Sequence, residues 1–202
     1  MTFSRPLTLT GKHVTLEPLS EKHHDGLCSA VEDGRMWTTW FTRIPSPDQM
    51  AAEIQKRLEL SEQGTMLPWT IRRNDTGAIC GMTTFCNIRA DHRRLEIGST
   101  WLAKSAQRTP INTEAKLLQL THAFEALDCI AVEFRTHWHN HVSRAAVTRL
   151  GAKQDGVLRN HDPWRDGTMR DLVVFSIIES EWPTVRLSLR EKLTRAQTVA
   201  ST

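Results

Sequence analysis

The sequence predicts an α+β fold in which a central mixed, mostly antiparallel sheet is flanked by helices. Two observations support this: apolar residues change their period along the chain between two and about 3.6, and a hairpin is followed by a strand-helix-strand crossover. The 202 residues are 39% hydrophobic and 24% charged, which is enough to bury a core. No repeat or long linker divides the chain, so we expect one domain over residues 1–193 and a frayed tail over 194–202.

Two segments near the start of the chain carry clear local signals. Residues 13–19 alternate between apolar and polar and predict a strand, followed by a helix over residues 20–33. A second helix is marked by Ser46 as its N-cap, Pro47 at its first position and Gln49 completing a capping box. Its apolar residues then recur at every fourth position as far as about residue 58, which predicts one buried face.

The middle of the chain predicts strands. Residues 69–73 and 79–87 flank the turn-rich segment 74–77 and predict a hairpin. A strand at 95–102 is followed by a polar loop and then by a helix that reaches about residue 127.

The last third of the chain continues the alternation of strands and helices. Asn140 is placed to cap a short helix, and Gly151 is placed to end it. The predicted elements are, in order, a strand at 130–136, a helix at 140–150, a strand ending at 157–158, a long strand at 171–178 and a final helix to about 193.

Charge and cysteine content narrow the classes of function. The formal charge is 26 − 23 = +3, too small a bias to predict a nucleic-acid or membrane partner. No apolar run approaches the roughly 18 residues of a membrane span, and the first residues lack the apolar segment of a signal peptide. The four cysteines form no C-x-x-C pair, which favours reduced thiols. We therefore expect a cytoplasmic protein that is neither exported nor inserted into a membrane.

A loop at 104–114 joins a strand to a helix N-terminus, where backbone N–H groups and the helix dipole favour an anion such as phosphate. Three motifs surround it, in this order: Arg94-Leu-Glu-Ile-Gly-Ser-Thr-Trp-Leu102, Gln107-Arg-Thr-Pro-Ile-Asn112 and Asn140-His-Val-Ser-Arg-Ala-Ala-Val-Thr-Arg-Leu-Gly151. Together they resemble the GCN5-related N-acetyltransferases (GNAT), in particular the RimJ/RimL-like branch of ribosomal-protein N-terminal acetyltransferases. The resemblance extends from about residue 9 to residue 178.

This resemblance implies a GNAT fold with a splayed β-α-β cofactor site and an acyltransferase that uses acetyl-CoA. An amine, either a small molecule or a peptide N-terminus, would attack the thioester directly, and no metal would be needed. The alternative on the same fold is a catalytically degenerate protein that binds coenzyme A or sequesters a ligand. The oligomeric state is not readable from the sequence, although exposed edge strands would allow a homodimer.

The resemblance also implies which residues bind coenzyme A. The pyrophosphate loop of the family reads Gln/Arg-x-x-Gly-x-Gly/Ala, but Pro110 and Asn112 stand at its glycine positions here. Pro110 removes one N–H donor, whereas Asn112 can adopt the left-handed conformation of a glycine. Alternatively, Thr109 and Pro110 only begin a helix. The implied cofactor-binding residues are Thr100, Trp101, Leu102, Gln107, Arg108, Thr109, Asn112, Thr113, Asn140 and Ser143.

The strand at 95–102 resembles the family strand that separates from its neighbour at a bulge, which Gly98 would facilitate. Backbone N–H groups near 100–102 would then bond the acyl carbonyl and stabilise its developing negative charge. Glu96 matches the glutamate of the family's Glu-Ile-Gly motif and is the candidate general base, acting through a water. Alternatively, Glu96 is an exposed glutamate that pairs with Arg94 or Arg93.

The chain has no tyrosine, the residue that many relatives use to protonate the leaving thiolate. Ser143 is the nearest substitute, because its hydroxyl lies in the first turn of a helix whose dipole favours a developing thiolate. Asn140 would hold the pantetheine amide. The ordinary alternative is that Asn140 and Ser143 only cap the helix.

Two further groups of residues are candidates. His137, His139 and His141 alternate and suggest zinc, hence a zinc hydrolase, but no carboxylate or cysteine lies nearby in the sequence to orient them. We therefore prefer His139 as an auxiliary base or cleft residue. The resemblance places the amine acceptor between the first helices and the connection before the last strand, hence the following candidates: Trp37, Trp40, Phe41, Arg159, Arg165 and Arg170. These tryptophans are equally typical of a core, and the arginines of a solvated rim.

Overall fold

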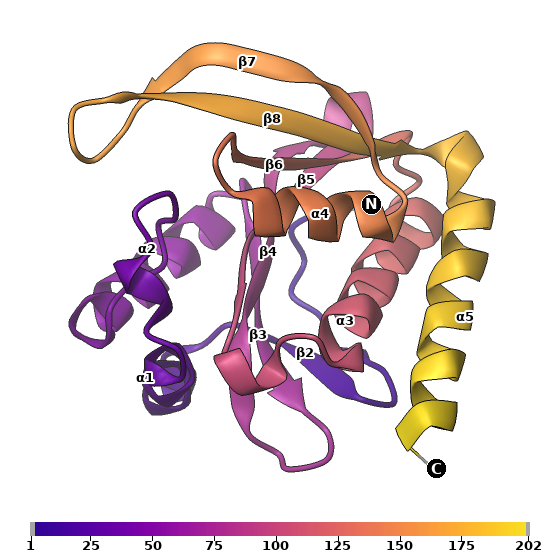
Figure 1. The fold of residues 1–202 in the computed structure, drawn as a ribbon, viewed down its shortest axis with the longest axis horizontal. Helices are drawn as coiled ribbons and strands as arrows, with labels where there is room; N and C mark the ends of the chain where they lie inside the picture. Colours follow the sequence, from indigo (N-terminus) through magenta and orange to yellow (C-terminus); the bar gives the residue numbers. More distant parts are fainter. Residues whose placement is uncertain (1–2, 201–202) are drawn as a thin grey trace.

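The protein is described by a computed structural model that covers residues 3–200. Its strands form an eight-stranded sheet in the order β1-β2-β3-β4-β5-β6-β8-β7, with every neighbouring pair antiparallel except β5 and β6. The strands are β1 (Leu9–Thr10), β2 (Val14–Pro18), β3 (Leu67–Arg73), β4 (Ile79–Arg89), β5 (Arg94–Leu102), β6 (Ala131–His137), β7 (Lys153–Pro163) and β8 (Met169–Ile178). The expected α+β architecture is confirmed (Figure 1).

Helices flank this sheet, with α1 and α2 on one side of Figure 1 and α3 and α5 on the other. The helices are α1 (His24–Glu32), α2 (Pro47–Glu62), α3 (Pro110–Thr121), a π-helical turn (His122–Ala126), α4 (His141–Leu150) and α5 (Trp182–Ala200). Short 3-10 turns lie at Glu21–His23, Met36–Thr38, Ala90–His92, Lys104–Ala106 and Glu179–Glu181. Within residues 3–200, no helix is long and apolar enough to cross a bilayer.

Two threonines of β4 show that α2 and α3 cover opposite faces of the sheet. Thr84 accepts a hydrogen bond from buried Arg57 of α2, at 2.6 Å. The preceding residue, Thr83, accepts one from Lys116 of α3, at 2.7 Å. Successive residues of a strand point to opposite faces. The face of the sheet that carries Thr84 is therefore covered by α2, and the face that carries Thr83 is covered by α3.

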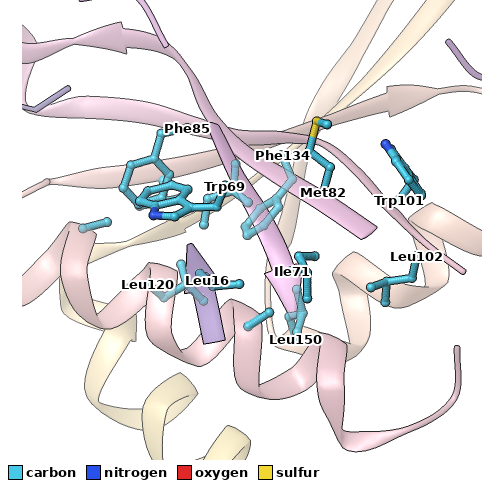
Figure 2. Packing of buried hydrophobic residues seen from close by; sticks show 14 of the residues in the cluster. Leu16, Trp69, Ile71, Met82, Phe85, Trp101, Leu102, Leu120, Phe134 and Leu150 are labelled. Carbon is cyan, nitrogen blue, oxygen red and sulfur yellow. The ribbon is translucent and has the colours of Figure 1, made fainter. Parts of the chain in front are cut away.

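The core lies between the sheet and these helices. Trp69 of β3 and Phe85 of β4 make an edge-to-face contact, with 4.8 Å between ring centroids. Figure 2 shows this pair above Leu16 and Leu120, which come from β2 and α3. All four side chains are fully buried. This apolar layer fixes α3 against the sheet and therefore fixes the loop that precedes it.

The capping signals in the sequence are confirmed. Ser46 and Gln49 form the expected capping box at the start of α2, with Pro47 at the first helical position. The Asn140 side chain caps α4, accepting a hydrogen bond from the backbone N–H of Ser143 at 3.0 Å. Gly151 ends α4 with φ of 109°, a left-handed conformation that favours glycine.

Several boundaries differ from the prediction. The short strand β1 was not expected, and β7 continues to Pro163 rather than ending at residue 158. Helix α5 extends to Ala200, beyond its expected end near residue 193. Residues 201–202 of the expected tail lie outside the described residues, and the fraying of the tail stays a prediction. The helix expected to reach residue 127 changes into a π-helical turn at His122. The length of β7 was missed because this edge strand is mostly exposed and its sequence carries no apolar alternation.

A buried carboxylate ties α3 to the first turn of the sheet. Glu114 accepts hydrogen bonds from the backbone N–H groups of Lys12, His13 and Val14, at 2.9, 2.5 and 2.9 Å. A Cβ atom on Gly11 would lie 2.5 Å from the carboxyl carbon, so only glycine allows this approach. Nothing in the sequence marked Glu114, because glutamate in a helix is ordinarily exposed.

We predict that Glu114→Ala lowers the free energy of unfolding by about 3 kcal/mol, because it leaves several backbone donors without a partner. Urea denaturation measures this change. Glu191→Ala, at an exposed position of α5, is the matched control and should change the stability by less than about 0.5 kcal/mol. Equal effects of the two substitutions would contradict the role of Glu114.

Candidate active site

Strands β5 and β6 separate after a short stretch of parallel pairing. They are in register only at Arg94↔Ala131, Leu95↔Val132 and Glu96↔Glu133. Beyond Glu96, β5 stays paired with β4, whereas β6 stays paired with β8. The expected splay is therefore confirmed, and Glu96 stands at the apex of the wedge between the two strands. Past this apex, β5 presents a strand edge to which an extended amide chain could bond.

A bulge in β5 accompanies this divergence. Between the pairs Thr84↔Gly98 and Met82↔Trp101, two residues of β5, Ser99 and Thr100, stand opposite one residue of β4, and Ser99 has φ of 48°. The prediction of a bulge was right, and Gly98 directly precedes the bulged residues. A Cβ atom on Gly98 would lie 2.6 Å from a carboxylate oxygen of Glu96 and 2.8 Å from the sulfur of Cys86. Gly98 therefore leaves room for the Glu96 side chain.

Glu96 is buried, with 7% of its surface exposed. The side-chain amide of Asn87 donates a hydrogen bond to its Oε2 at 2.6 Å, and Nε of Arg135 lies 3.6 Å from the same oxygen. Burial raises the pKa of Glu96, while the bond from Asn87 and the charge of Arg135 act in the opposite direction. A carboxylate with a raised pKa is a better proton acceptor.

The alternative interpretation of Glu96 as a surface ion-pair partner is wrong. Arg94 pairs instead with Glu133, at 2.8 Å, and Arg93 pairs with Asp128, at 2.5 Å. Neither arginine makes an ion pair with Glu96 in the described part of the chain. Arg93 and Arg94 are the arginines nearest to Glu96 in the sequence, but the arginine that lies beside its carboxylate is Arg135 of β6.

The loop before α3 has the form of a capped helix start. Thr109 accepts a hydrogen bond from the N–H of Ile111 at 3.4 Å, and Pro110 occupies the first helical position. The left-handed residue is Arg108, with φ of 59°, and not Asn112, which is helical. The side chain of Gln107 donates to the carbonyl of Leu102 at 3.0 Å and so ties the loop to the end of β5.

The remaining predicted cofactor-binding residues lie in the second half of β5 and in the first turn of α3. Thr100, Trp101 and Leu102 follow the bulge in β5; Thr100 is exposed, while the other two are buried. Asn112 and Thr113 are half-buried in the first turn of α3. The N–H groups of a first helical turn have no partner inside the helix, so they can receive an anion.

At the start of α4, the side chain of Asn140 caps the helix by accepting the backbone N–H of Ser143. This is the capping role that the sequence suggested as the alternative to a cofactor contact. Ser143 is half-buried, and its hydroxyl has no hydrogen-bond partner among residues 3–200. Its contact with a leaving group stays a prediction.

An aromatic cluster lies where the acceptor was expected. Trp40 is 51% exposed and contacts Phe41, His137 and His139, with ring centroids 5.4, 5.2 and 5.4 Å away. The indole N–H of Trp164, on the β7–β8 connection, donates to the carbonyl of Trp40 at 2.8 Å. His137 and Trp164 were not predicted as members, because these contacts join segments distant in the sequence.

The other predicted acceptor residues are divided between different places. Arg170 lies over the ring of Trp164, with its guanidinium carbon 4.8 Å from the centroid, and is paired with Asp162. Arg159 instead pairs with Asp171 and lines a separate depression of about 290 Å³ with Trp138. Among the described contacts, none brings Trp37 into the cluster; it packs against the core and under Arg35.

The three histidines do not form a metal site in the described structure. The rings of His137 and His139 are 5.6 Å apart, and Nδ1 of His137 accepts the backbone N–H of His139 at 3.1 Å. Among residues 3–200, no three His, Cys, Asp or Glu side chains group in a way that could hold a metal ion. Burial, together with the charges of His139 and Arg170, lowers the pKa of His137.

A buried lysine lies beneath the strand that borders the wedge, and sequence reasoning missed it. Nζ of Lys116 donates to the hydroxyl oxygens of Thr83 and Thr100, at 2.7 and 2.9 Å, and to the side-chain oxygen of Gln119 at 2.8 Å. Burial lowers the pKa of Lys116 to about 7. The sequence signal for the burial of Lys116 is its position on the apolar stripe of α3, between Ala115 and Leu120. It was missed because a lysine is ordinarily exposed.

Comparison with known proteins gives the family. The Acetyltransferase (GNAT) domain family matches residues 13–153. A Bacillus subtilis (strain 168) protein named "Putative ribosomal N-acetyltransferase YdaF" is 34% identical over 106 residues, which are 52% of this chain and 57% of that protein.

Two solved structures share the fold. A GCN5-related N-acetyltransferase from Brucella melitensis has a TM-score of 0.85 at 29% identity, covering 94% of this chain and 86% of that one. Mycobacterium smegmatis RimJ, in complex with CoA-disulfide, has a TM-score of 0.79 at 21% identity, covering 94% and 96%. The family match spans most of the chain, so the protein belongs to the GNAT acetyltransferase family, as the three motifs predicted.

We predict that Lys116 makes stability depend on pH. Its folded pKa of about 7 lies below the ordinary 10.5, so between these values the unfolded chain holds a proton that the folded chain lacks. The free energy of unfolding should therefore rise with pH across this window, relative to Lys116→Met, by at most about 1.4 kcal/mol per pH unit. Denaturation of both proteins from pH 6 to about 10 measures this; a constant difference would show that the buried amine titrates normally.

Proposed function

We propose that the protein is an N-acetyltransferase that transfers an acetyl group from acetyl-CoA to a primary amine, with protein N-termini as the first acceptors to test. The observation that carries this proposal is a buried carboxylate, Glu96, at the apex of two diverging strands in a chain of the GNAT family. The name of the YdaF relative supports a ribosomal acceptor. Such an acceptor would place the protein in the cytoplasm.

The residues around the wedge fit coenzyme A. The edge of β5 beyond Glu96 can bond an extended amide chain, and the first turn of α3 can receive phosphate. We assign the amide chain to the backbone at 100–102 and to Asn140, and the phosphates to the loop at 107–109 and to Asn112 and Thr113. Acetyl-CoA would supply an activated acetyl thioester. Pro110 provides one N–H fewer than a glycine would, which weakens this phosphate site without removing it.

Glu96 is the general base in this proposal. An α-amino group, with a pKa of about 7.7–8.0, loses its proton more readily than a lysine side chain at about 10.4. Glu96 would accept the proton from the attacking amine through a water, as its buried position requires. Backbone N–H groups after the Ser99 bulge would stabilise the negative charge that develops on the acyl oxygen.

Ser143 and the aromatic cluster complete the site. The Ser143 hydroxyl lies in the first turn of α4, whose dipole favours negative charge on a departing sulfur. Trp40, Phe41 and His139 would line the acceptor entrance, with His139 as an auxiliary base and Arg170 behind Trp164. Because Trp40 is exposed while its partners hold it from several sides, it offers a preformed ring surface to an acceptor.

A protein that only binds or sequesters coenzyme A is not favoured, because the family match and the relatives are acetyltransferases. The homodimer stays a prediction. Its most accessible route would be the exposed edge strand β7.

We expect acetyl-CoA and CoA to stabilise the protein against heat. A ligand at 100 times its dissociation constant should add about 2.7 kcal/mol of stability. Thermal unfolding with acetyl-CoA, with CoA and with buffer alone measures this. If neither ligand shifts the transition at millimolar concentration, the assignment of coenzyme A to the wedge is wrong.

We expect Glu96→Gln to lower the turnover number about 100-fold and to remove the rise of activity with pH that a carboxylate base causes. The assay follows acetylation of peptides that carry ribosomal-protein N-termini, by mass spectrometry from pH 5 to about 9. Stabilisation by CoA should be unchanged, because Glu96 is not assigned to the cofactor. Glu59→Gln, at an exposed position of α2, is the control. An unchanged pH profile in Glu96→Gln would remove Glu96 from the mechanism.

A further inference from the structure

The buried cluster around Lys116 has one exposed member, on the strand that borders the wedge. Thr83, Lys116 and Gln119 are buried, whereas Thr100 is exposed on β5 just after the bulge. The hydroxyls of Thr83 and Thr100 lie 2.8 Å apart, and each is bonded to Nζ of Lys116. Thr100 therefore connects an interior amine with the open side of the strand.

This network keeps its hydrogen bonds whether Lys116 is a charged ammonium or a neutral amine. As an ammonium, Lys116 donates one N–H to each of three oxygens, those of Thr83, Thr100 and Gln119. As a neutral amine, it donates two N–H groups and accepts one hydroxyl proton, which Thr100 can supply. A proton can thus pass from Lys116 to the Thr100 oxygen while the Thr100 hydroxyl proton leaves on the other side.

The charges around Lys116 allow this exchange near neutral pH. In the described structure, no carboxylate is paired with the amine, and burial lowers its pKa to about 7. Among the described residues, the one titratable group whose charge acts on the amine is the Cys86 thiol of β4, and burial raises the pKa of that thiol, so it stays neutral. Glu96 is in register with Cys86 and shares the other face of the sheet, with Thr84.

We propose that Thr100, recharged by Lys116, donates the proton that neutralises the thiolate leaving group and so replaces the tyrosine that this chain lacks. The inference rests on the proposed function and deepens it. Thr100 is the residue in contact with the sulfur, and Lys116 is a positioning residue that acts through it. Ser143 is less suited to this step, because no described side chain is bonded to its hydroxyl and could replace its proton.

Over one turnover, each proton-transfer group returns to its starting protonation state. The amine nitrogen forms a bond to the acyl carbon, the carbon–sulfur bond breaks, and the electron pair of that bond stays on sulfur. The sulfur takes the Thr100 hydroxyl proton, and Thr100 takes one from the Lys116 ammonium. Glu96 takes the proton lost by the amine and releases it to solvent. After the thiol leaves, Lys116 regains a proton from water through Thr100.

The test measures the ionisation of the CoA thiol bound to the 202-residue protein, by the ultraviolet absorbance of the thiolate across pH. Desulfo-CoA, which lacks the sulfur, provides the baseline. A proton donor in contact with the sulfur should lower the pKa of the bound thiol by about one unit, tenfold in the ionisation constant, relative to Lys116→Met and to Thr100→Val. Thr100→Ser should retain the wild-type value. Thr84→Val, a buried threonine on the other face of β4, is the matched control.

Each result decides between the two proposals. Equal thiol pKa values in the wild type, Lys116→Met and Thr100→Val would overturn the Lys116–Thr100 relay and leave the acetyltransferase proposal intact. An absence of CoA binding by the wild type would overturn both. If Ser143→Ala restores the ordinary thiol pKa and Thr100→Val does not, the proton donor is Ser143 and not Thr100. If Lys116→Met does not fold, Thr100→Val against Thr100→Ser decides alone.

Discussion

The separation of β5 from β6 after Glu96 and Glu133 determines where this protein can bind an extended ligand. A parallel pair that continued to the end of both strands would satisfy its own backbone groups and leave no strand edge for a ligand. Here each strand instead keeps its outer neighbour, β4 or β8, and the sheet remains continuous only at three register positions. The wedge is thus built into the sheet itself.

The two faces of the sheet divide the chemistry between them. Glu96 shares its face with Thr84 and the helix α2, whereas Thr100 contacts Lys116 of α3 on the other. The Ser99 bulge allows this change of face within a few residues of one strand. Glu96 and Lys116, each with a pKa moved toward neutrality by burial, therefore lie on opposite faces of the sheet.

Features with local causes could be predicted from the sequence. The capping box of Ser46 and Gln49, the Asn140 cap and the splayed strand with Glu96 depend on neighbouring residues or on a motif, and they are confirmed. Glu114 and Lys116 could not be predicted, because a charged residue is buried only when distant parts of the chain supply its partners. The contact of Trp40 with Trp164 likewise joins two loops far apart in the sequence.

Amide hydrogen exchange of β5 measures whether coenzyme A completes the open edge of this strand. The backbone N–H groups at 97–102 should exchange more slowly when CoA is added, since an extended amide chain would occupy the wedge. The N–H groups at 15–18 of β2, which is separated from β5 by β3 and β4, should be unaffected. CoA binding without added protection at 97–102 would show that coenzyme A does not occupy the edge of β5.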